Sequence, residues 1–566
     1  MAAAAFLFNN NSSASPCKGL NCYIKIKNSL VVKFRLSGYY RIIEVKKDVV
    51  SVVFSSVEFI LCFLPAFLLL YGLTPKGMKN LVLLVGSLVF YAVGDPMYLI
   101  LLMASVLVNF LIGSRLGAVP GTDQGTGGRK GQKSKGRRQG RHRVEQWDFS
   151  TTDFDSAGAD REYRSGREDA PDGRERQQAA DRGYRVDQKK GLLLLAVLGN
   201  IGLLVLFKGG LGDAGLPLGI SFYTFQILSY LVDVYKGDVA WEDSFVRFAS
   251  YIVMFPQLIS GPIVMYGEVR DALQERKFTA EGIQEGLKVF TAGLAAKVLL
   301  AERIGILWQE VQVTGFESIS IPLAWMAAVA YSMKLYFDFY GYSLMAIGLG
   351  RMLGFALPEN FQEPYMSGSV REFYRRWHMT LGRWFCKYVY IPLGGSRKGE
   401  LRTVCNLLVV WLLTSIWHGG TPNFLIWGML LWLFIVLERQ LEALGFLRLF
   451  QAGPLRLIPR LYLWMVIPVT WMCFAITDVS QLQIFLGRMF GVVEGIRVSP
   501  GDWSRALGTY WHLFAIGGIA CTPVLRKCFH RWKDKVPVVV LLVALFWLCI
   551  YRLQVEGQNP FMYFDY

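Results

Sequence analysis

The sequence predicts an all-α protein, a polytopic transmembrane helical bundle of about 10–12 spans with additional re-entrant or interfacial helices. The chain has 566 residues, of which 53% are hydrophobic and 14% are aromatic. Its apolar residues gather in long blocks and do not recur at the period of an amphipathic helix or strand. The blocks also lack the alternation of barrel strands, so helices are the structure that satisfies their backbone groups in lipid.

The apolar blocks follow one another along most of the chain. A perpendicular helical span needs about 20 mainly apolar residues, and several blocks are shorter, so we expect some of them to be re-entrant or buried inside the bundle. In chain order the blocks are Val53–Leu73, Leu81–Gly94, Tyr98–Gly113, Leu192–Phe207, Leu216–Tyr235, Phe248–Tyr266, Gly286–Ala301, Ile319–Phe337, Thr403–Trp417, Phe424–Leu437, Leu461–Ile476, Ala506–Val524 and Val538–Tyr551.

Two segments differ from this membrane domain, which we place at residues 53–566. Residues 1–52 are polar and basic, and we interpret them as an N-terminal extension from a mis-called start, with the functional chain beginning near Val52 or Val53. Residues 118–190 are Gly-rich and then densely charged, which predicts a disordered loop. Its many Lys and Arg residues place this loop in the cytoplasm and the chain in the cytoplasmic membrane.

The formal net charge of +17 and the nine cysteines narrow the function further. In a membrane chain, Lys and Arg collect in cytoplasmic loops, so the charge favours membrane lipids as partners and no nucleic acid. The cysteines are scattered, with no Cys-x-x-Cys pair and no Cys/His cluster. The sequence therefore predicts neither a disulfide framework, nor a metal site, nor a bound cofactor.

Two of the five histidines lie in unusual settings. His418 closes an apolar helix and is followed by Gly419 and Gly420, and His378 lies in a run of arginines and aromatic residues. Ionisable groups at membrane depth are costly and usually face a cavity or a proton relay, which makes both histidines functional candidates. The alternative is that backbone carbonyls satisfy each ring, and that the histidine only fixes a helix end.

The stretch from Ser369 onward predicts an amphipathic helix lying along the membrane. Ser369 and Glu372 fit a capping box. Aromatic and apolar residues share one face, and cations form the other. This basic side either anchors the helix on anionic lipid or attracts the phosphates of a cytosolic acyl thioester such as a coenzyme A derivative. The apolar face consists of Phe373, Trp377, Leu381, Trp384 and Tyr388, and the basic side of Arg371, Arg375, Arg383 and Lys387.

Two further segments break the apolar pattern. Asp338 lies among aromatic residues, and we expect it either to pair with one of the arginines or to face an aqueous passage, since an unpaired charge there would be very costly. The segment at residues 255–263, FPQLISGPI, has two prolines and a glycine inside an apolar block. It predicts either a broken helix that lines a cavity or a simple proline kink.

Together these stretches resemble the membrane-bound O-acyltransferase superfamily, and within it the alginate O-acetyltransferase branch. Two departures stand out: Leu344 replaces the acidic residue usual after GYS, and the loop at 118–190 is longer than usual. The matching motifs occur in order across most of residues 53–440, and the chain's ending NPFMYF is also similar; the motifs are FPQLISGPI, YFDFYGYS, MAIGLGRMLGF, LPENFQEPY, EFYRRWHMTLGRWFCKYVYIPLGG and SIWHGGTPNFLIWG.

This resemblance implies a helical bundle with a tunnel, which an acyl thioester enters from the cytosol and an acceptor enters from outside. It implies that His418 is the principal catalytic histidine and His378 the second. A near-neutral imidazole can take the proton from an acceptor hydroxyl as it attacks the thioester carbonyl. The candidate residues for binding donor or substrate are Asp338, Arg371, Arg375, Arg383, Trp377, Trp417 and Asn423.

The prediction is an O-acyltransferase that moves acetyl from acetyl-CoA, as co-substrate, toward a cell-surface or exported polysaccharide or an extracytoplasmic acyl-accepting protein. One alternative is a D-alanyl transferase of the teichoic acid type, which would use a carrier-protein thioester. A lipid-linked sugar transporter is another, although the inverted repeats of transporters are not evident. A bis-histidine haem protein is a third, and would require His378 and His418 to face each other across the haem.

Overall fold

The computed structural model describes residues 54–117, 173–208, 216–259, 261–445, 455 and 457–556, together with three strands near the N-terminus; for the strands and for residues 173–186 it describes the backbone alone. Most of the extension at 1–52, the loop at 118–172, Ser260 and the NPFMYF ending lie outside the described residues. The strands β1 (Tyr23–Ile26), β2 (Ser29–Leu36) and β3 (Tyr39–Lys46) pair as an antiparallel sheet in the order β1-β2-β3, with Leu36 opposite Tyr39 at the β2–β3 turn.

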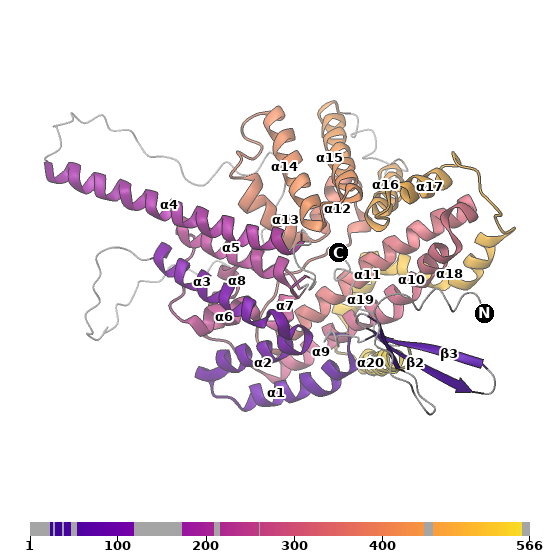
Figure 1. Ribbon diagram of the computed structural model, residues 1–566, viewed down its shortest axis with the longest axis horizontal. Helices are drawn as coiled ribbons and strands as arrows, with labels where there is room; N and C mark the ends of the chain where they lie inside the picture. The colour runs from indigo at the N-terminus through magenta and orange to yellow at the C-terminus, as the bar shows by residue number, and fades with distance from the viewer. Residues whose placement is uncertain are drawn as a thin grey trace.

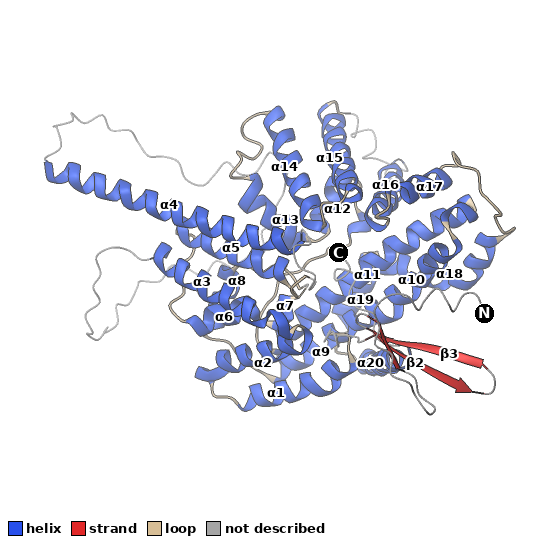
Figure 2. Cartoon of the chain, in the orientation of Figure 1, coloured by secondary structure: helices blue, strands red, loops and turns tan. Residues whose placement is uncertain are grey.

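The membrane domain is a bundle of helices, as the apolar blocks predict (Figures 1 and 2). The label η marks 3-10 or π-helical turns. The N-terminal helices are η1 (Phe59–Phe63), α1 (Leu64–Leu73), η2 (Lys76–Met78), α2 (Lys79–Gly94), η3 (Pro96–Tyr98), α3 (Leu99–Gly117) and α4 (Gly173–Lys208). The central helices are α5 (Ile220–Lys236), α6 (Phe245–Val253), α7 (Phe255–Leu258), α8 (Tyr266–Gln274), α9 (Ala280–Ala295), η4 (Ala296–Ala301), α10 (Glu302–Thr314), η5 (Phe316–Ser318) and α11 (Ile321–Met352).

The C-terminal half holds the segments that carry both candidate histidines. Its first helices are η6 (Pro364–Met366), α12 (Val370–Arg376), α13 (Met379–Phe385), η7 (Cys386–Tyr390), α14 (Glu400–His418) and α15 (Pro422–Ala443). The last are α16 (Leu457–Ala475), α17 (Val479–Met489), α18 (Asp502–Ala520), α19 (Pro523–Trp532) and α20 (Val536–Glu556).

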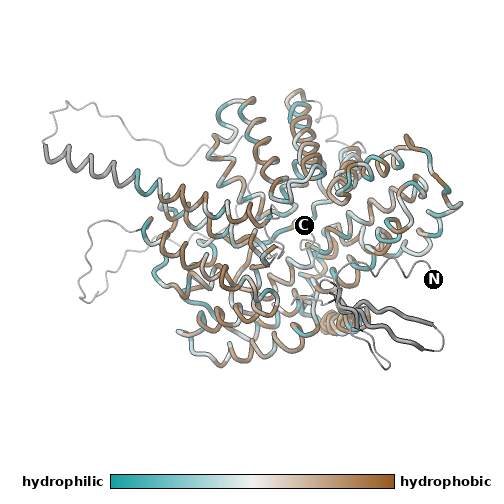
Figure 3. The backbone as a smooth tube through the Cα atoms, viewed as in Figure 1, coloured by the Kyte–Doolittle hydropathy of each residue, from teal (hydrophilic) through white to brown (hydrophobic). Residues whose placement is uncertain are grey.

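The all-α, multi-pass architecture is confirmed, and the spans fall into two kinds. Apolar residues run along most helices in Figure 3. Within the part of the chain that the structure describes, seven helices are long and apolar enough to cross a membrane, fewer than the predicted 10–12. The remaining apolar blocks form shorter or more polar helices, many of them in the packed centre. The seven are Lys76–Gly94, Pro96–Gly117, Asp187–Lys208, Glu400–His418, Pro422–Ala443, Leu457–Ala475 and Val536–Val555.

Helix α4 corrects the predicted limit of the polar loop. The sequence places a disordered segment at 118–190, but residues 173–190 belong to α4, which continues without a break into an apolar span. The charged residues of this first part do not interrupt the helix, because helix propensity does not depend on apolar side chains. A buried amide pair joins the span to α3: Asn200 Nδ2 donates to Asn109 Oδ1 at 2.8 Å.

Helices α9 and α11 approach each other closely, backbone to backbone, at four glycines. A Cβ added to Gly293 would lie 2.5 Å from the carbonyl oxygen of Gly341, and one added to Gly286 would lie 2.5 Å from that of Gly348. The two glycines on each helix are seven residues apart, which is about two helical turns, so they lie on the same face of their helix. Helix α11 has 32 residues, about 48 Å at 1.5 Å per residue, and most of it is buried.

The segment at 255–263 is a broken helix, as one of the two interpretations predicts. Helix α6 ends at Val253, and the four residues of α7 follow after Met254, all of them buried. Its irregular backbone is covered by protein, which is one of the conditions under which such backbone is tolerated at membrane depth. The cavity described below is lined by other segments.

Candidate active site

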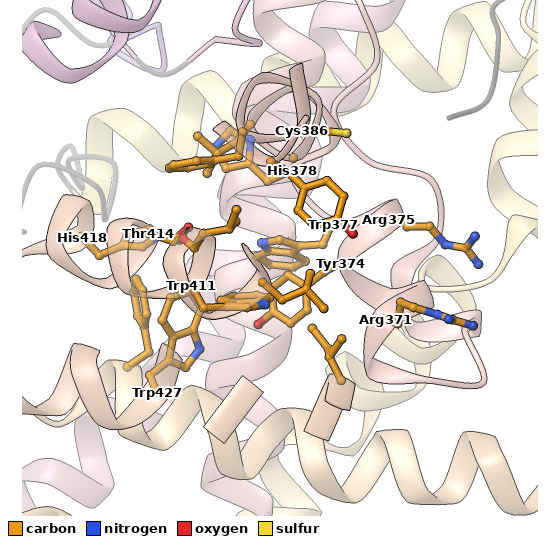
Figure 4. Close-up of a pocket in the computed structure, with 18 of the residues that line it drawn as sticks. Arg371, Tyr374, Arg375, Trp377, His378, Cys386, Trp411, Thr414, His418 and Trp427 are labelled. Carbon is orange, nitrogen blue, oxygen red and sulfur yellow. Dashed lines mark hydrogen bonds between the residues drawn. The ribbon is translucent and has the colours of Figure 1, made fainter. Parts of the chain in front are cut away.

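A cavity of about 170 Å³ lies among α11 to α16, and both candidate histidines line it (Figure 4). Its wall is mainly aromatic and aliphatic. His418 lies on one side of the view, and Arg371 and Arg375 lie on the opposite side. The lining consists of Leu335, Arg371, Tyr374, Arg375, Trp377, His378, Leu381, Gly382, Phe385, Cys386, Tyr390, Leu407, Val410, Trp411, Thr414, His418, Trp427, Ile435, Arg439, Trp471 and Phe474.

His378 lies at a break between two short helices, and not within one amphipathic helix as predicted. Its φ angle of 46° is left-handed, so α12 ends at Arg376 and α13 begins at Met379. Such an angle is uncommon outside glycine, although histidine adopts it more readily than most residues. The backbone of Asn360 stabilises the break, since its carbonyl accepts from Met379 N at 2.9 Å.

The start of α12 agrees with half of the predicted capping box. Ser369 Oγ accepts from the backbone N–H of Glu372 at 3.0 Å. The Glu372 carboxylate accepts from the N–H of Gly368 at 2.9 Å, one residue before the expected Ser369. The cap still satisfies two backbone donors and fixes where α12 begins.

Asn360 also fixes the proton of the His378 ring. Its Oδ1 accepts from the backbone N–H of Thr380 at 3.3 Å, and a backbone N–H can only donate, so this atom of the amide is the oxygen. His378 Nδ1 lies 3.0 Å from the same oxygen and must therefore carry the proton. The lone pair is then on Nε2, which is buried and has no hydrogen-bond partner in the described structure.

The surroundings of His378 keep its ring neutral. The residue is 4% exposed and lies outside the seven apolar spans. Burial lowers the pKa of His378, because desolvation disfavours the imidazolium. The ring of Phe339 packs edge-on against it at 4.7 Å. His378 is thus an oriented, neutral hydrogen-bond acceptor.

His418 is the last residue of α14, and aromatic side chains enclose its ring. The residue is 5% exposed, and the rings of Trp427 and Phe474 lie edge-on at 5.2 and 5.1 Å. Gly419 follows with a φ of 154°, and a Cβ there would meet the Phe424 ring at 2.8 Å. Glycine is therefore needed at position 419 for packing against Phe424.

Lys208 holds the end of the helix that carries His418, and sequence reasoning did not select it. Its Nζ donates to the carbonyl of Trp417, the residue directly before His418, and lies 5.4 Å from the Trp417 ring centroid. A cation at a helix C-terminus interacts favourably with the exposed carbonyls and the helix dipole. The signal in the sequence was a lone lysine ending an apolar block.

The predicted basic side divides into two groups. Arg371 and Arg375 line the cavity, and Arg439 joins them there from α15. Arg371 also pairs with Glu442 at 2.6 Å. Arg383 lies outside the lining, because both of its terminal nitrogens bind Glu268, at 2.5 and 2.9 Å. Lys387 likewise pairs with Asp233 at 2.8 Å.

Asp338 is paired, but its partner is a lysine and not one of the predicted arginines. Its Oδ1 lies 2.6 Å from Lys297 Nζ, and Glu302 lies 3.6 Å from the same nitrogen. Asp338 and Lys297 are both buried and lie outside the cavity lining. Asp338 therefore contributes to the packing of α11 against η4.

The remaining predicted residues are split between cavity and packing. Trp377 lines the cavity and packs on Trp471 at 5.0 Å. Trp417 packs against Phe225 at 5.5 Å on the other side of α14. The side chain of Asn423 is buried at the start of α15, where its Nδ2 donates to the carbonyl of Cys473 at 3.2 Å. Neither Trp417 nor Asn423 lines the cavity.

In the described part of the chain, no group of three His, Cys, Asp or Glu residues could hold a metal ion. The cavity instead combines the imidazole rings of His378 and His418 with an apolar wall and nearby arginines. Such a site can transfer protons and bind an anionic co-substrate.

Comparisons with known proteins cover the segments that form this cavity. Residues 242–476 match the model of the MBOAT, membrane-bound O-acyltransferase family, and they include both histidines. The chain is 31% identical over 545 residues to the probable alginate O-acetylase AlgI of Pseudomonas putida, covering 91% of this chain and 100% of the relative. It is 37% identical to the peptidoglycan O-acetyltransferase of Helicobacter pylori over 38% of this chain and 46% of the relative.

A third relative is more distant and covers a similar part of the chain. The teichoic acid D-alanyltransferase of Bacillus subtilis is 29% identical over 225 residues, which is 38% of this chain and 56% of the relative. The match to the alginate acetylase extends over nearly the whole of both proteins, and the acyltransferase model covers the segments that form the cavity. The chain therefore belongs to the membrane-bound O-acyltransferase family, and it is an O-acyltransferase.

Proposed function

We propose that the protein transfers acetyl from cytosolic acetyl-CoA to a hydroxyl group of a cell-surface or exported polysaccharide, directly or through an extracytoplasmic acyl-accepting protein. One observation carries the proposal: His378 and His418, from different helices, line a single apolar cavity that also has arginines in its wall. The relatives named for acetylation of alginate and peptidoglycan support acetyl as the group and a polymer as the acceptor.

In the proposed reaction, the acceptor oxygen attacks the carbonyl carbon of the thioester. His418 takes the proton of the acceptor hydroxyl as the new C–O bond forms. The C–S bond then breaks, and the departing coenzyme A thiolate takes a proton from the imidazolium. This sequence returns His418 to its neutral form and needs no acyl-enzyme intermediate.

His378 has the separate role of orienting the donor. Its Nε2 accepts hydrogen bonds and is buried without a partner in the described structure, a costly state that a bound donor would relieve. The pantetheine arm of coenzyme A carries amide N–H groups that can fill this role. His378 therefore binds the arm, and His418 acts on the acceptor.

Cavity size favours a short acyl group. Its volume of about 170 Å³ is below the roughly 300–1,000 Å³ of sites that enclose drug-sized ligands. An acetyl group on the end of a pantetheine arm suits this space better than a long acyl chain does. Arg371 and Arg375 then lie where they can attract the phosphates of the donor by charge-assisted hydrogen bonds, whereas Arg439 is bound to Glu400 at 2.7 and 2.8 Å.

The same cations support the predicted orientation in the membrane. Lys and Arg collect on the cytoplasmic side of membrane proteins. We therefore place the arginine end of the cavity and the loop at 118–172 on the cytosolic side of the cytoplasmic membrane, and the acceptor on the opposite side. Cysteine labelling of intact cells at Arg397, which is exposed near the arginine end, would check this orientation.

The test is acetyl transfer by the purified protein in proteoliposomes with labelled acetyl-CoA inside and a soluble polysaccharide acceptor outside. His418→Ala should lower kcat by about 10²–10⁴-fold, the usual contribution of a general base. His378→Ala should leave measurable turnover with a raised donor KM. His512→Ala is the matched control, because His512 is exposed on α18, away from the cavity.

If His418→Ala keeps a near-normal kcat in vesicles that contain the same amount of correctly inserted protein, His418 is not the general base. The donor is tested in the same vesicles by replacing acetyl-CoA with a D-alanyl thioester of a carrier protein. Transfer from the carrier protein alone would make the chain a D-alanyl transferase. Export of labelled polymer without any acyl transfer would support the transporter alternative.

A further inference from the structure

Helix α19 has two opposite faces with different chemistry, and the proposed reaction uses neither. Three cations, Arg526, Lys527 and Arg531, lie along one side of the helix, and His530 lies among them. Leu525 and Trp532 lie on the other side and are each 47% exposed. A short helix with exposed apolar residues opposite a cluster of cations is typical of a segment that lies in the membrane interface.

An open hollow on the protein surface is lined by Arg526, Lys527, His530 and Arg531 of α19 and by one carboxylate, Glu359. Arg526 is neutralised in part, since it pairs with Glu363 at 2.8 Å and with Glu359 at 3.3 Å. Lys527 and Arg531 have no carboxylate partner among the described residues. The hollow therefore has an excess of positive charge, which an anion would offset.

The position of α19 places this hollow at the end of a membrane span. The helix ends at Trp532, and the apolar span Val536–Val555 begins four residues later. The turn between them is fixed to α9, because Lys533 pairs with Glu285 and Asp534 pairs with Lys288. These ion pairs fix the turn between α19 and the apolar span against α9.

We propose that the basic face of α19 binds the phosphate headgroup of an anionic phospholipid, whose acyl chains lie along Leu525 and Trp532. The headgroup supplies the negatively charged partner that Lys527 and Arg531 do not have in the protein. The acyl chains of the lipid cover the exposed apolar side of the helix. Charge-assisted hydrogen bonds from Arg and Lys to phosphate are among the stronger polar contacts in proteins. A soluble phosphate compound would satisfy the charges but would leave the apolar face uncovered, which favours the lipid.

The test is native mass spectrometry of the full-length protein in mild detergent, titrated with phosphatidylglycerol or with phosphatidylcholine. The protein should retain phosphatidylglycerol preferentially. Each basic residue near an anionic lipid surface contributes roughly fivefold to binding, so Lys527→Gln/Arg531→Gln should bind phosphatidylglycerol about 25-fold more weakly. Arg497→Gln/Arg505→Gln is the matched control, since it removes the same charge from exposed positions outside the hollow and should bind normally.

A charge-preserving variant, Lys527→Arg/Arg531→Lys, separates loss of charge from loss of structure and should keep the affinity of the natural protein. Equal binding of the two lipids, or unchanged affinity in the double glutamine variant, would overturn the proposal. Displacement of phosphatidylglycerol by millimolar inorganic phosphate or coenzyme A would also overturn it, and would assign the hollow to a soluble phosphate compound.

Discussion

Asn360 offers the sharpest test of how the site is built, because one atom of its side chain sets the tautomer of His378. Asn360→Ala removes the acceptor of the Nδ1 proton and also the acceptor of the Thr380 hydroxyl, which donates to the same oxygen at 2.9 Å. The ring is then free to carry its proton on Nε2, where it can no longer accept a hydrogen bond from the donor.

The structure sets the magnitude of this effect. A buried donor left without its acceptor costs about 1–3 kcal/mol. Since each 1.4 kcal/mol is a factor of ten, kcat/KM for the acyl donor should fall about 5- to 150-fold. If His378 binds the donor and His418 does the proton chemistry, the loss should appear as a raised donor KM with kcat nearly unchanged.

The assay is steady-state acetyl transfer in proteoliposomes over a range of acetyl-CoA concentrations. Asn109→Ala is the matched control, because it also removes a buried amide that bonds to a neighbour, Asn200, but between α3 and α4 and away from the cavity. The control should lower thermal stability and leave the donor KM unchanged. An unchanged donor KM in Asn360→Ala would refute the orienting role, and a large fall in kcat alone would move His378 into the chemical step.

Asn360→Asp extends the test to pH. The carboxylate can still accept from Nδ1–H, so the tautomer is kept, but its negative charge raises the pKa of His378 from the lowered value that burial gives. A protonated ring cannot accept from the donor. The donor KM should therefore rise as the pH falls through this higher pKa, at a pH where the natural enzyme still binds its donor normally. Identical pH profiles for the two proteins would contradict the assigned hydrogen bond.

Three further substitutions separate function from packing. Lys208→Met should lower kcat roughly tenfold at unchanged donor KM, because it releases the carbonyl of Trp417 beside His418. A hydrogen bond from a charged group contributes about 1.5–3 kcal/mol. An unaltered kcat in proteoliposomes would show that the end of α14 does not need this hydrogen bond. Asp338→Asn should cost about 3–5 kcal/mol of stability, since it leaves Lys297 buried without its closest charge, and thermal melting in detergent measures this. Arg383→Gln should leave the donor KM within twofold, because its guanidinium is bound to a carboxylate away from the cavity; a clear rise in KM would return this residue to the donor site.

The apolar blocks predict the class of fold because they depend on composition alone. The two histidines can also be selected from the sequence, because histidine is rare in this chain and both lie beside apolar or aromatic runs. Other features depend on contacts across long stretches of chain. The helical pattern continues through Trp377 and His378, and nothing local reveals the break there, since Asn360, 18 residues upstream, supplies the stabilising contacts.

The ion-pair partners of the buried and interfacial charges also could not be predicted from neighbouring residues in the sequence. The sequence offered arginines nearby as partners for Asp338, yet the partner is Lys297, 41 residues upstream in a different helix. Arg383 is bound to Glu268, 115 residues upstream, and does not line the cavity. A basic helical face therefore indicates where cations gather, but tertiary contacts decide which of them remain available to a ligand.

The glycine contacts between α9 and α11 have a consequence for how substrates enter. Where two backbones touch without side chains between them, neither helix can slide or tilt without collision, so α11 forms a fixed wall. This wall supports the site: Leu335 lines the cavity, and Phe339 packs on the ring of His378. The opposite wall of the cavity comes from α14 and α15, so any widening that admits an acyl donor must come from that side. The cavity thus has one fixed wall, α11, and one wall that can move. Substitutions that stiffen α14 against α15 should slow the entry of the acyl donor and the release of product without altering the chemical step.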